Sequence, residues 1–276
     1  MIFPADAPRE ARLSGHGIRV RLESGQNISP GIDDGWGTGR AGMQYRDLVP
    51  DRLGGRLIAS HIRILKGGPV PDYVHHHDVQ FQLIYCYRGW VRVVYEDQGP
   101  SFILEAGDCV LQPPHIRHRV LKCSDNMEVI EVSSPAEHET FVDHDMALPR
   151  PTLDANRSFL GQRFVRHQSS QADWEPGSRD SFLAKDTGIA KATNGLASVQ
   201  VLKPTIRDRE LTIACRAGVV FVFVLEGSMI LRRNDQTDRA MEAQDSFVIA
   251  EETAITTTHY SDELRLLHVA INQEER

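Results

Sequence analysis

Short runs of Val, Ile, Leu, Phe and Tyr recur along the chain from about residue 45, and each run ends at Gly, Pro or Asp. Five successive runs cover residues 81–89, 90–99, 100–108, 109–118 and 127–135. Runs of this length and composition are typical of strands, and their close spacing leaves no room for crossover helices. The pattern therefore predicts an all-β fold built from antiparallel sandwiches or barrels.

The same pattern occurs a second time in the C-terminal half of the chain. Residues 197–205 resemble residues 60–68, and the run around Gly227 resembles the run around Gly89, at an offset of 138 positions. With this alignment Gly107 falls within one residue of Gln244. Two similar units of comparable length predict a duplicated chain with two tandem barrels.

The runs also suggest where the domains begin and end. We expect a loop-rich N-terminal arm at residues 1–44, a first barrel at 45–135, a connector at 136–165 and a second barrel at 166–276. The arm is rich in turn-forming residues and is expected to wrap the barrel or a second subunit. Within it, Asp33 and Asp34 are expected in a solvated turn, and Trp36 is expected as an anchor more than as a lid.

The connector has few strand signals, and we expect one short helix in it, around residues 137–141.

Composition narrows the classes of partner. The chain has 276 residues, a formal charge of −7 and a pI near 5.9, which argues against a nucleic acid or an acidic membrane as partner. No apolar run approaches the length of a membrane span, and the first residues lack the apolar core of a secretory signal. We therefore expect a cytoplasmic protein that takes a small-molecule substrate. Exposed barrel edges and the long arm favour a homodimer.

The cysteines form no Cys-x-x-Cys pair, which argues against a thiolate zinc site or a redox motif. In a cytoplasmic chain we expect them to be reduced and to serve as small apolar residues: Cys86, Cys109, Cys123 and Cys215.

Side chains that bind metals concentrate between Pro71 and His118. Residues two apart on a strand share a face, so the imidazoles of His75 and His77 can enter one pocket while His76 points the opposite way. Gln82, at the start of the next run, and His118, from a distant strand, complete a candidate set of four ligands. Three neutral imidazoles and an amide oxygen suit one divalent transition metal ion. A six-coordinate ion would keep two positions open for water, dioxygen or a chelating substrate.

These residues resemble the two motifs of the cupin superfamily. The first motif corresponds to Gly68, six residues, His75-x-His77, four residues, Gln82, six residues and Gly89. The second corresponds to Gly107, five residues, Pro113-Pro114-His115, two residues and His118. The resemblance covers most of residues 45–272 and implies a bicupin, with two jelly-roll (double-stranded β-helix) barrels and metal ligands only in the first.

The chain departs from the motifs in three ways. The gap between Gly68 and His75 is one residue longer than in the usual motif. Gln82 replaces the usual Glu, so the ligand set loses a negative charge, which favours an anionic or chelating substrate. His115 replaces a glycine, and the sequence leaves open whether it is a general base, a group behind the ligands or a surface turn residue.

The second repeat lacks the ligands. The positions that match His75, His77, Gln82 and His118 are occupied by Ile213, Cys215, Val220 and approximately Ile255. We therefore expect no metal in the C-terminal barrel, which would stabilise the first barrel or form an interface. His259 and His268 are expected to be structural or exposed.

The alternation of side chains along two strands predicts which residues lie around the first site. Alternation from Gln82 puts Ile84 and Cys86 on the barrel-lining face. In the strand before the cluster, Ile62 and Ile64 share one face and His61 and Arg63 the other. The second pair would be substrate contacts if it faced the barrel, but we expect it to face solvent or a subunit interface.

The residues and the resemblance together favour an enzyme. We expect a mononuclear metal-dependent dioxygenase, with iron ahead of zinc, nickel and manganese as the metal. The alternatives are an isomerase, cyclase or lyase that uses the metal as a Lewis acid, and a cupin that binds a metal or a ligand without turnover.

Overall fold

The structure is a computed structural model of the whole chain. It describes the backbone of residues 2–3, 10–15 and 18–23, and then residues 35–50, 52–151, 153–177, 181–205, 210–232 and 238–272. Part of the expected N-terminal arm, including Asp33 and Asp34, lies outside the described residues. The chain divides into two compact units, Met1–Arg166 and His167–Arg276.

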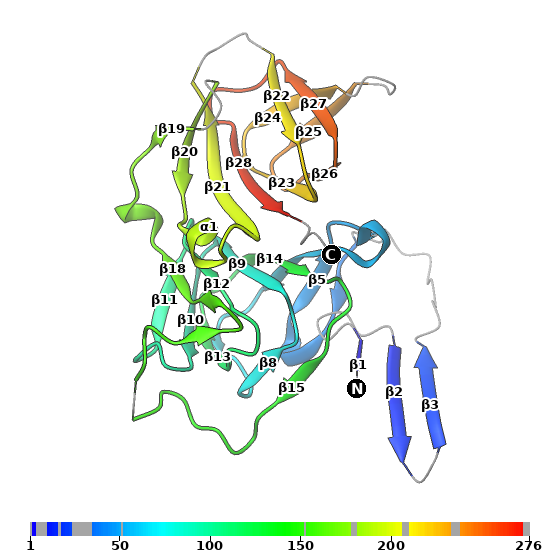
Figure 1. Cartoon of the computed structure of the whole chain (residues 1–276), viewed down its shortest axis with the longest axis vertical. Helices are drawn as coiled ribbons and strands as arrows, with labels where there is room; N and C mark the ends of the chain where they lie inside the picture. Colours follow the sequence, from blue (N-terminus) through cyan, green and yellow to red (C-terminus); the bar gives the residue numbers. More distant parts are fainter. Residues whose placement is uncertain are drawn as a thin grey trace. The chain divides into compact units, whose positions relative to one another are not determined.

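In the N-terminal unit, two antiparallel sheets enclose one core (Figure 1). Apolar side chains from both sheets meet there, among them Ile62, Val129, Val91 and Leu104. The larger sheet has the order β18-β12-β9-β14-β6-β5-β4 and the other β11-β10-β13-β8-β15, with β7 paired to β13. Their bounds are β4 Gly37–Thr38, β5 Gln44–Asp47, β6 Ile58–Ile64, β7 Gly68–Pro69, β8 His75–His77, β9 Phe81–Arg88, β10 Trp90–Tyr95, β11 Phe102–Glu105, β12 Cys109–Leu111, β13 His118–Cys123, β14 Met127–Ser134, β15 Thr140–Val142 and β18 Val165–His167.

Short elements accompany this barrel. β16 (Ser158–Phe159) pairs with β17 (Gln162–Arg163), and the 3-10 turns η1 and η2 cover Arg40–Gly42 and Arg52–Gly55. Near the N-terminus, β1 (Ile2–Phe3), β2 (Glu10–Gly15) and β3 (Ile18–Glu23) form a three-stranded sheet.

The C-terminal unit repeats the strand order. Its sheets run β19-β20-β21-β28-β23-β26 and β22-β27-β24-β25, so β26-β23-β28-β21 matches β12-β9-β14-β6 and β25-β24-β27-β22 matches β11-β10-β13-β8. The bounds are η3 Ser169–Gln171, β19 Glu175–Pro176, β20 Phe182–Asp186, α1 Ile189–Ala192, β21 Ala197–Pro204, β22 Leu211–Cys215, β23 Val219–Glu226, β24 Ser228–Arg232, β25 Arg239–Glu242, β26 Ser246–Ala250, β27 Thr253–Thr258 and β28 Arg265–Ile271.

The duplication also appears in local contacts. The backbone N–H after Gly89 donates to the Ser124 hydroxyl at 3.0 Å, and the backbone N–H after Gly227 donates to the Ser261 hydroxyl at 3.1 Å. Both glycines have positive φ, of 67° and 77°. The predicted fold of two tandem jelly-roll barrels is therefore confirmed.

No helix in the described part of the chain is both long enough and apolar enough to cross a membrane.

The connector differs from expectation. Where a short helix was predicted at residues 137–141, Thr140–Val142 forms strand β15, which pairs with β8 in the register Thr140 to His77. The backbone groups on the free side of β8 offer a hydrogen-bonding partner, and a segment of Thr, Phe and Val favours a strand. The consequence is that β15 joins the sheet that carries the histidines.

His61 and Arg63 face away from the barrel core, as expected, but His61 is fully buried instead of facing solvent or a partner. The Trp36 ring lies 4.9 Å from the His61 ring, and the Arg63 guanidinium lies 3.8 Å above Trp36. The arm residue Trp36 thus packs as an anchor over this face. Neither His61 nor Arg63 lines the cavity of the first barrel.

His61 accepts a hydrogen bond from Arg46 at 3.0 Å and donates one to Glu128 at 2.7 Å. Burial lowers the pKa of His61 to about 4, against the opposing effect of Glu128. In the unfolded chain His61 takes up a proton below about pH 6.5, whereas the folded protein does so only near pH 4. Its contribution to stability is therefore complete above pH 6.5 and is lost as the pH falls from 6.5 to 4.

We predict that the free energy of unfolding of the native chain falls more steeply between pH 6.5 and 4 than that of a His61→Gln variant, by up to about 3 kcal/mol over the window. Urea titrations at a series of pH values measure both slopes. Equal slopes would show that His61 does not titrate differently in the folded and unfolded states.

Candidate metal centre

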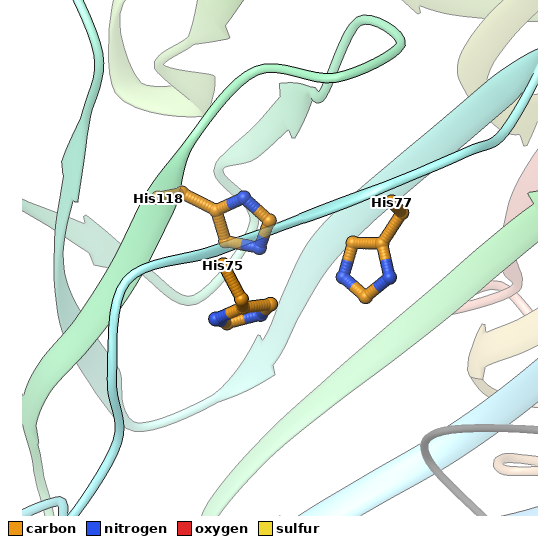
Figure 2. Close-up of side chains that lie close together, drawn as sticks. All are labelled: His75, His77 and His118. Carbon is orange, nitrogen blue, oxygen red and sulfur yellow. The ribbon is translucent and has the colours of Figure 1, made fainter. Parts of the chain in front are cut away.

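Three buried histidines meet on the inner face of one sheet of the first barrel. His75 and His77 lie two residues apart on β8, and His118 begins β13 directly opposite His75 in the ladder. The ring centroids are 4.2 Å apart for His75 and His118, and 5.3 Å apart for His77 and His118. One ligand nitrogen from each ring lies within 4.8 Å of the others (Figure 2).

Hydrogen bonds at the Nδ1 atoms fix how these rings are oriented. His75 Nδ1 lies 2.8 Å from the Tyr73 carbonyl oxygen, and His118 Nδ1 lies 3.1 Å from that of Ile116. Because a carbonyl oxygen only accepts, both Nδ1 atoms carry the proton. The Thr140 hydroxyl lies 2.8 Å from His77 Nδ1 and can accept a hydrogen bond from it. The neutral rings of His75 and His118 therefore keep their lone pairs on Nε2, as a metal ligand requires, and His77 does so when its Nδ1 donates to Thr140.

Burial keeps the three rings neutral. Loss of hydration lowers the pKa of His75 to about 3, assisted by the positive charge of Arg40. It also lowers the pKa values of His77 and His118 well below the usual range, and the neighbouring imidazoles add to this effect. Near neutral pH the cluster therefore presents three lone pairs and no proton that a metal ion would have to displace.

Two of these lone pairs face hydrogen-bond donors. Arg40 Nη2 lies 3.0 Å from His75 Nε2, and Gln112 Nε2 lies 2.8 Å from His118 Nε2. Three convergent, buried, neutral imidazole nitrogens fit a divalent transition metal, which would take these lone pairs in place of the donors. The donor set therefore forms a three-histidine metal-binding site.

Gln82 lies buried at the start of β9, on the next sheet. Its amide nitrogen donates a hydrogen bond to the carboxylate of Glu131 on β14. This contact fixes the amide nitrogen toward Glu131 and leaves the amide oxygen as the atom that can act as a ligand. The role of Gln82 as fourth ligand stays a prediction. A carboxylate is nevertheless present beside Gln82, on Glu131 of the neighbouring strand.

The site opens onto a cavity inside the barrel. Its wall is mostly apolar, and its polar members gather at the histidines. The apolar members are Met43, Ile62, Ile84, Val91, Val93, Val120, Met127 and Val129, and the polar ones are Arg40, Tyr45, His77, Tyr95, Gln112, His118, Glu131 and His138. The predicted inward positions of Ile84 and Cys86 are confirmed, the latter within the apolar core.

The sequence reasoning did not identify Arg40, Gln112, Glu131 or His138. Alternation along β14 from Val129 would have placed Glu131 on the inner face, and Gln112 lies within the second motif, directly before Pro113. Arg40 lies in a turn of the arm and His138 in the connector, where no periodic pattern indicates a direction.

His76 points away from the cluster, as predicted. Its ring stacks on Phe141, with centroids 5.2 Å apart, and lies 5.5 Å from the ring of His115. His115 Nε2 lies 3.3 Å from an Asp78 carboxylate oxygen, and the side chain of His115 is 40% exposed. The structure thus brings His115 together with His76 and does not bring it to the three candidate ligands.

The second barrel has the same register without the chemistry. Ile213 pairs with Ile255, as His75 pairs with His118 in the first barrel. These isoleucines, Cys215 and Val220 are buried in one apolar cluster. The predicted correspondence of positions is therefore confirmed by strand pairing.

Comparison with known proteins agrees with the double-barrel fold. Residues 60–133 match the cupin domain family. A search of curated proteins found no match to the chain. Among solved structures, salicylate 1,2-dioxygenase from Pseudaminobacter salicylatoxidans is similar, with 13% identity, a TM-score of 0.61 and coverage of 79% of this chain and 71% of that one.

Oxalate decarboxylase from Bacillus subtilis is also similar. Its structure at pH 4.6 has 12% identity and a TM-score of 0.57, and the match covers 83% of this chain and 72% of that chain. Another structure of the same enzyme, with 11% identity, a TM-score of 0.57 and coverage of 85% and 74%, is described with Mn(II) centres. At such low identity these likenesses concern the fold alone.

Fold and site together define a double-barrel protein with one three-histidine metal-binding site. The first barrel matches the cupin domain family over residues 60–133, and the chain has the two-barrel fold of the similar solved structures.

We predict that replacing His75, His77 or His118 by Ala abolishes stoichiometric metal binding while the protein stays folded. The loss in affinity should exceed the roughly 10–100-fold that removing an outer hydrogen-bond partner costs. His76→Ala is the matched control, because His76 lies on the same strand and faces away. Metal analysis after dialysis, with circular dichroism, makes the comparison. Unchanged metal content in a His75, His77 or His118 variant would show that the ligand set is wrong.

Proposed function

We propose that this chain is a mononuclear metal-dependent dioxygenase that acts on a small anionic or chelating organic substrate, with iron as the metal. The observation that carries the proposal is the position of the metal-binding site at the wall of a cavity inside the first barrel. The Nε2 atoms of His77 and His118 belong to side chains that line this cavity. A substrate held in the cavity would therefore lie next to the open coordination positions.

Different residues of the chain orient the ligands and supply them. Tyr73, Ile116 and Thr140 orient the imidazoles through their Nδ1 atoms. Gln82, held by Glu131, offers an amide oxygen. A neutral set of three imidazoles and one amide leaves the charge of the ion uncompensated, which favours an anionic ligand. A divalent metal bound there would supply Lewis acidity, and iron would add redox chemistry with dioxygen.

The cavity wall supports an oxygenase in particular. Apolar side chains such as Ile62, Val93 and Val129 keep bulk water from the reacting groups. The similar fold of a salicylate 1,2-dioxygenase is consistent with such chemistry but says nothing of the substrate of this chain. The expected homodimer and cytoplasmic location remain predictions from the sequence.

The proposal predicts that the protein reconstituted with Fe(II) under anaerobic conditions consumes dioxygen when an organic acid substrate is added. Uptake should equal the substrate consumed and should be lost in His77→Ala and kept in His76→Ala. An oxygen electrode and mass spectrometry of products make the measurement, after metal analysis of the protein as purified.

Tightly held zinc, nickel or manganese together with substrate turnover and no oxygen uptake would overturn the dioxygenase in favour of an isomerase, cyclase or lyase. Binding of metal and ligand without turnover would instead indicate a binding cupin.

A further inference from the structure

Arg40 is the cationic side chain among the described residues that line the cavity. It lies in the 3-10 turn η1, between β4 and β5, so the arm supplies it and not a barrel strand. Its Nη1 lies 3.3 Å from Asp72, whose side chain is 1% exposed. The other oxygen of Asp72 accepts a hydrogen bond from the Val120 backbone N–H at 2.9 Å. Asp72 is thus fixed and anchors the guanidinium at the site.

The other donor of Arg40 becomes available when the site is loaded. Arg40 Nη2 donates to His75 Nε2 at 3.0 Å. A metal ion on His75 would take the same lone pair, so Arg40 Nη2 would need another acceptor beside the metal. A carboxylate is a strong acceptor for the freed guanidinium nitrogen, because the hydrogen bond is assisted by the opposite charges.

The charges around the cavity favour a ligand with one negative charge. Arg40 pairs with Asp72, and Glu131 also lines the cavity, so the formal charges of these three side chains sum to −1. A divalent ion on the neutral histidines would change this to about +1. One carboxylate restores neutrality, whereas a small dianion leaves an excess negative charge in a poorly hydrated site.

The remaining wall favours an apolar body on that ligand. Half of the residues that line the cavity have apolar side chains, namely Met43, Ile62, Ile84, Val91, Val93, Val120, Met127 and Val129. An apolar group in contact with them gains about 25 cal/mol per Å² removed from water. A small dicarboxylate has no apolar group that could contact these side chains.

We propose that the substrate is an organic monocarboxylate with an apolar body, and that Arg40 binds its carboxylate while the barrel interior takes the body. The proposal rests on the proposed function for the metal beside the cavity, but its test does not depend on turnover. Arg40 is then a specificity-determining residue that the N-terminal arm contributes to the first barrel.

The test uses the full chain loaded with Zn(II), which binds without redox chemistry, and three probes in isothermal titration calorimetry. Benzoate has the carboxylate and the apolar body, benzamide has the body without the charge, and oxalate has the charge without the body. Benzoate should bind at least 10-fold more tightly than either. In Arg40→Met it should lose at least 10-fold in affinity, while benzamide binding and zinc content stay unchanged.

Two further variants make the result specific. Arg40→Lys should recover part of the benzoate affinity, because it keeps the charge but loses the separate nitrogens that contact Asp72 and the ligand. Arg63→Met is the matched control, since Arg63 packs on Trp36 outside the cavity, and it should bind benzoate like the native chain. Thermal melting verifies that each variant is folded.

Tighter binding of oxalate than of benzoate, equal binding of benzoate and benzamide, or unchanged benzoate affinity in both Arg40 variants would each overturn the proposal. These outcomes are independent of oxygen uptake. A protein that selects benzoate through Arg40 but consumes no dioxygen would contradict the proposed dioxygenase activity and leave the proposed ligand class intact. A protein that consumes dioxygen but does not select benzoate through Arg40 would contradict the ligand class and leave the dioxygenase activity intact.

Discussion

The register between β8 and β13 is the constraint on which the site depends. It sets His75 opposite His118 and, through the two-residue period of the strand, places His77 beside them. Hydrogen-bond partners at the three Nδ1 atoms then orient the rings so that the Nε2 atoms converge. A one-residue slip would point the imidazoles to the other face of the sheet. The metal-binding site is thus a consequence of strand pairing more than of the histidine run itself.

The duplicated barrel shows the same constraint without chemistry. Ile213 and Ile255 pair as His75 and His118 do, and their side chains fill an apolar core. The two barrels share the same strand register but carry different side chains, so positioning a residue and binding a metal are separate roles. The sheets position the residues, and only the first repeat uses that position for ligands. Its neighbouring interior is a cavity with polar groups gathered at one end.

Much of this arrangement could be predicted from the sequence, because strand alternation and motif spacing are local signals. They identified both barrels, the three histidines and the outward direction of His76. They failed where tertiary contacts decide. Thr140–Val142 is a strand because β8 offers it a partner, and His61 is buried because Trp36 lies over it. Arg40 reaches the cavity from a turn of the arm, where no periodic pattern indicates the direction of a side chain.

X-ray absorption spectroscopy of the metal-loaded protein tests the central claim most directly. The account predicts three imidazole nitrogen ligands at about 2.0–2.2 Å, further ligands that are oxygens, and no sulfur. Multiple scattering from the imidazole rings identifies the nitrogens. A spectrum with fewer than three imidazoles, or with a thiolate sulfur, would contradict the assignment of His75, His77 and His118 as the metal-binding site.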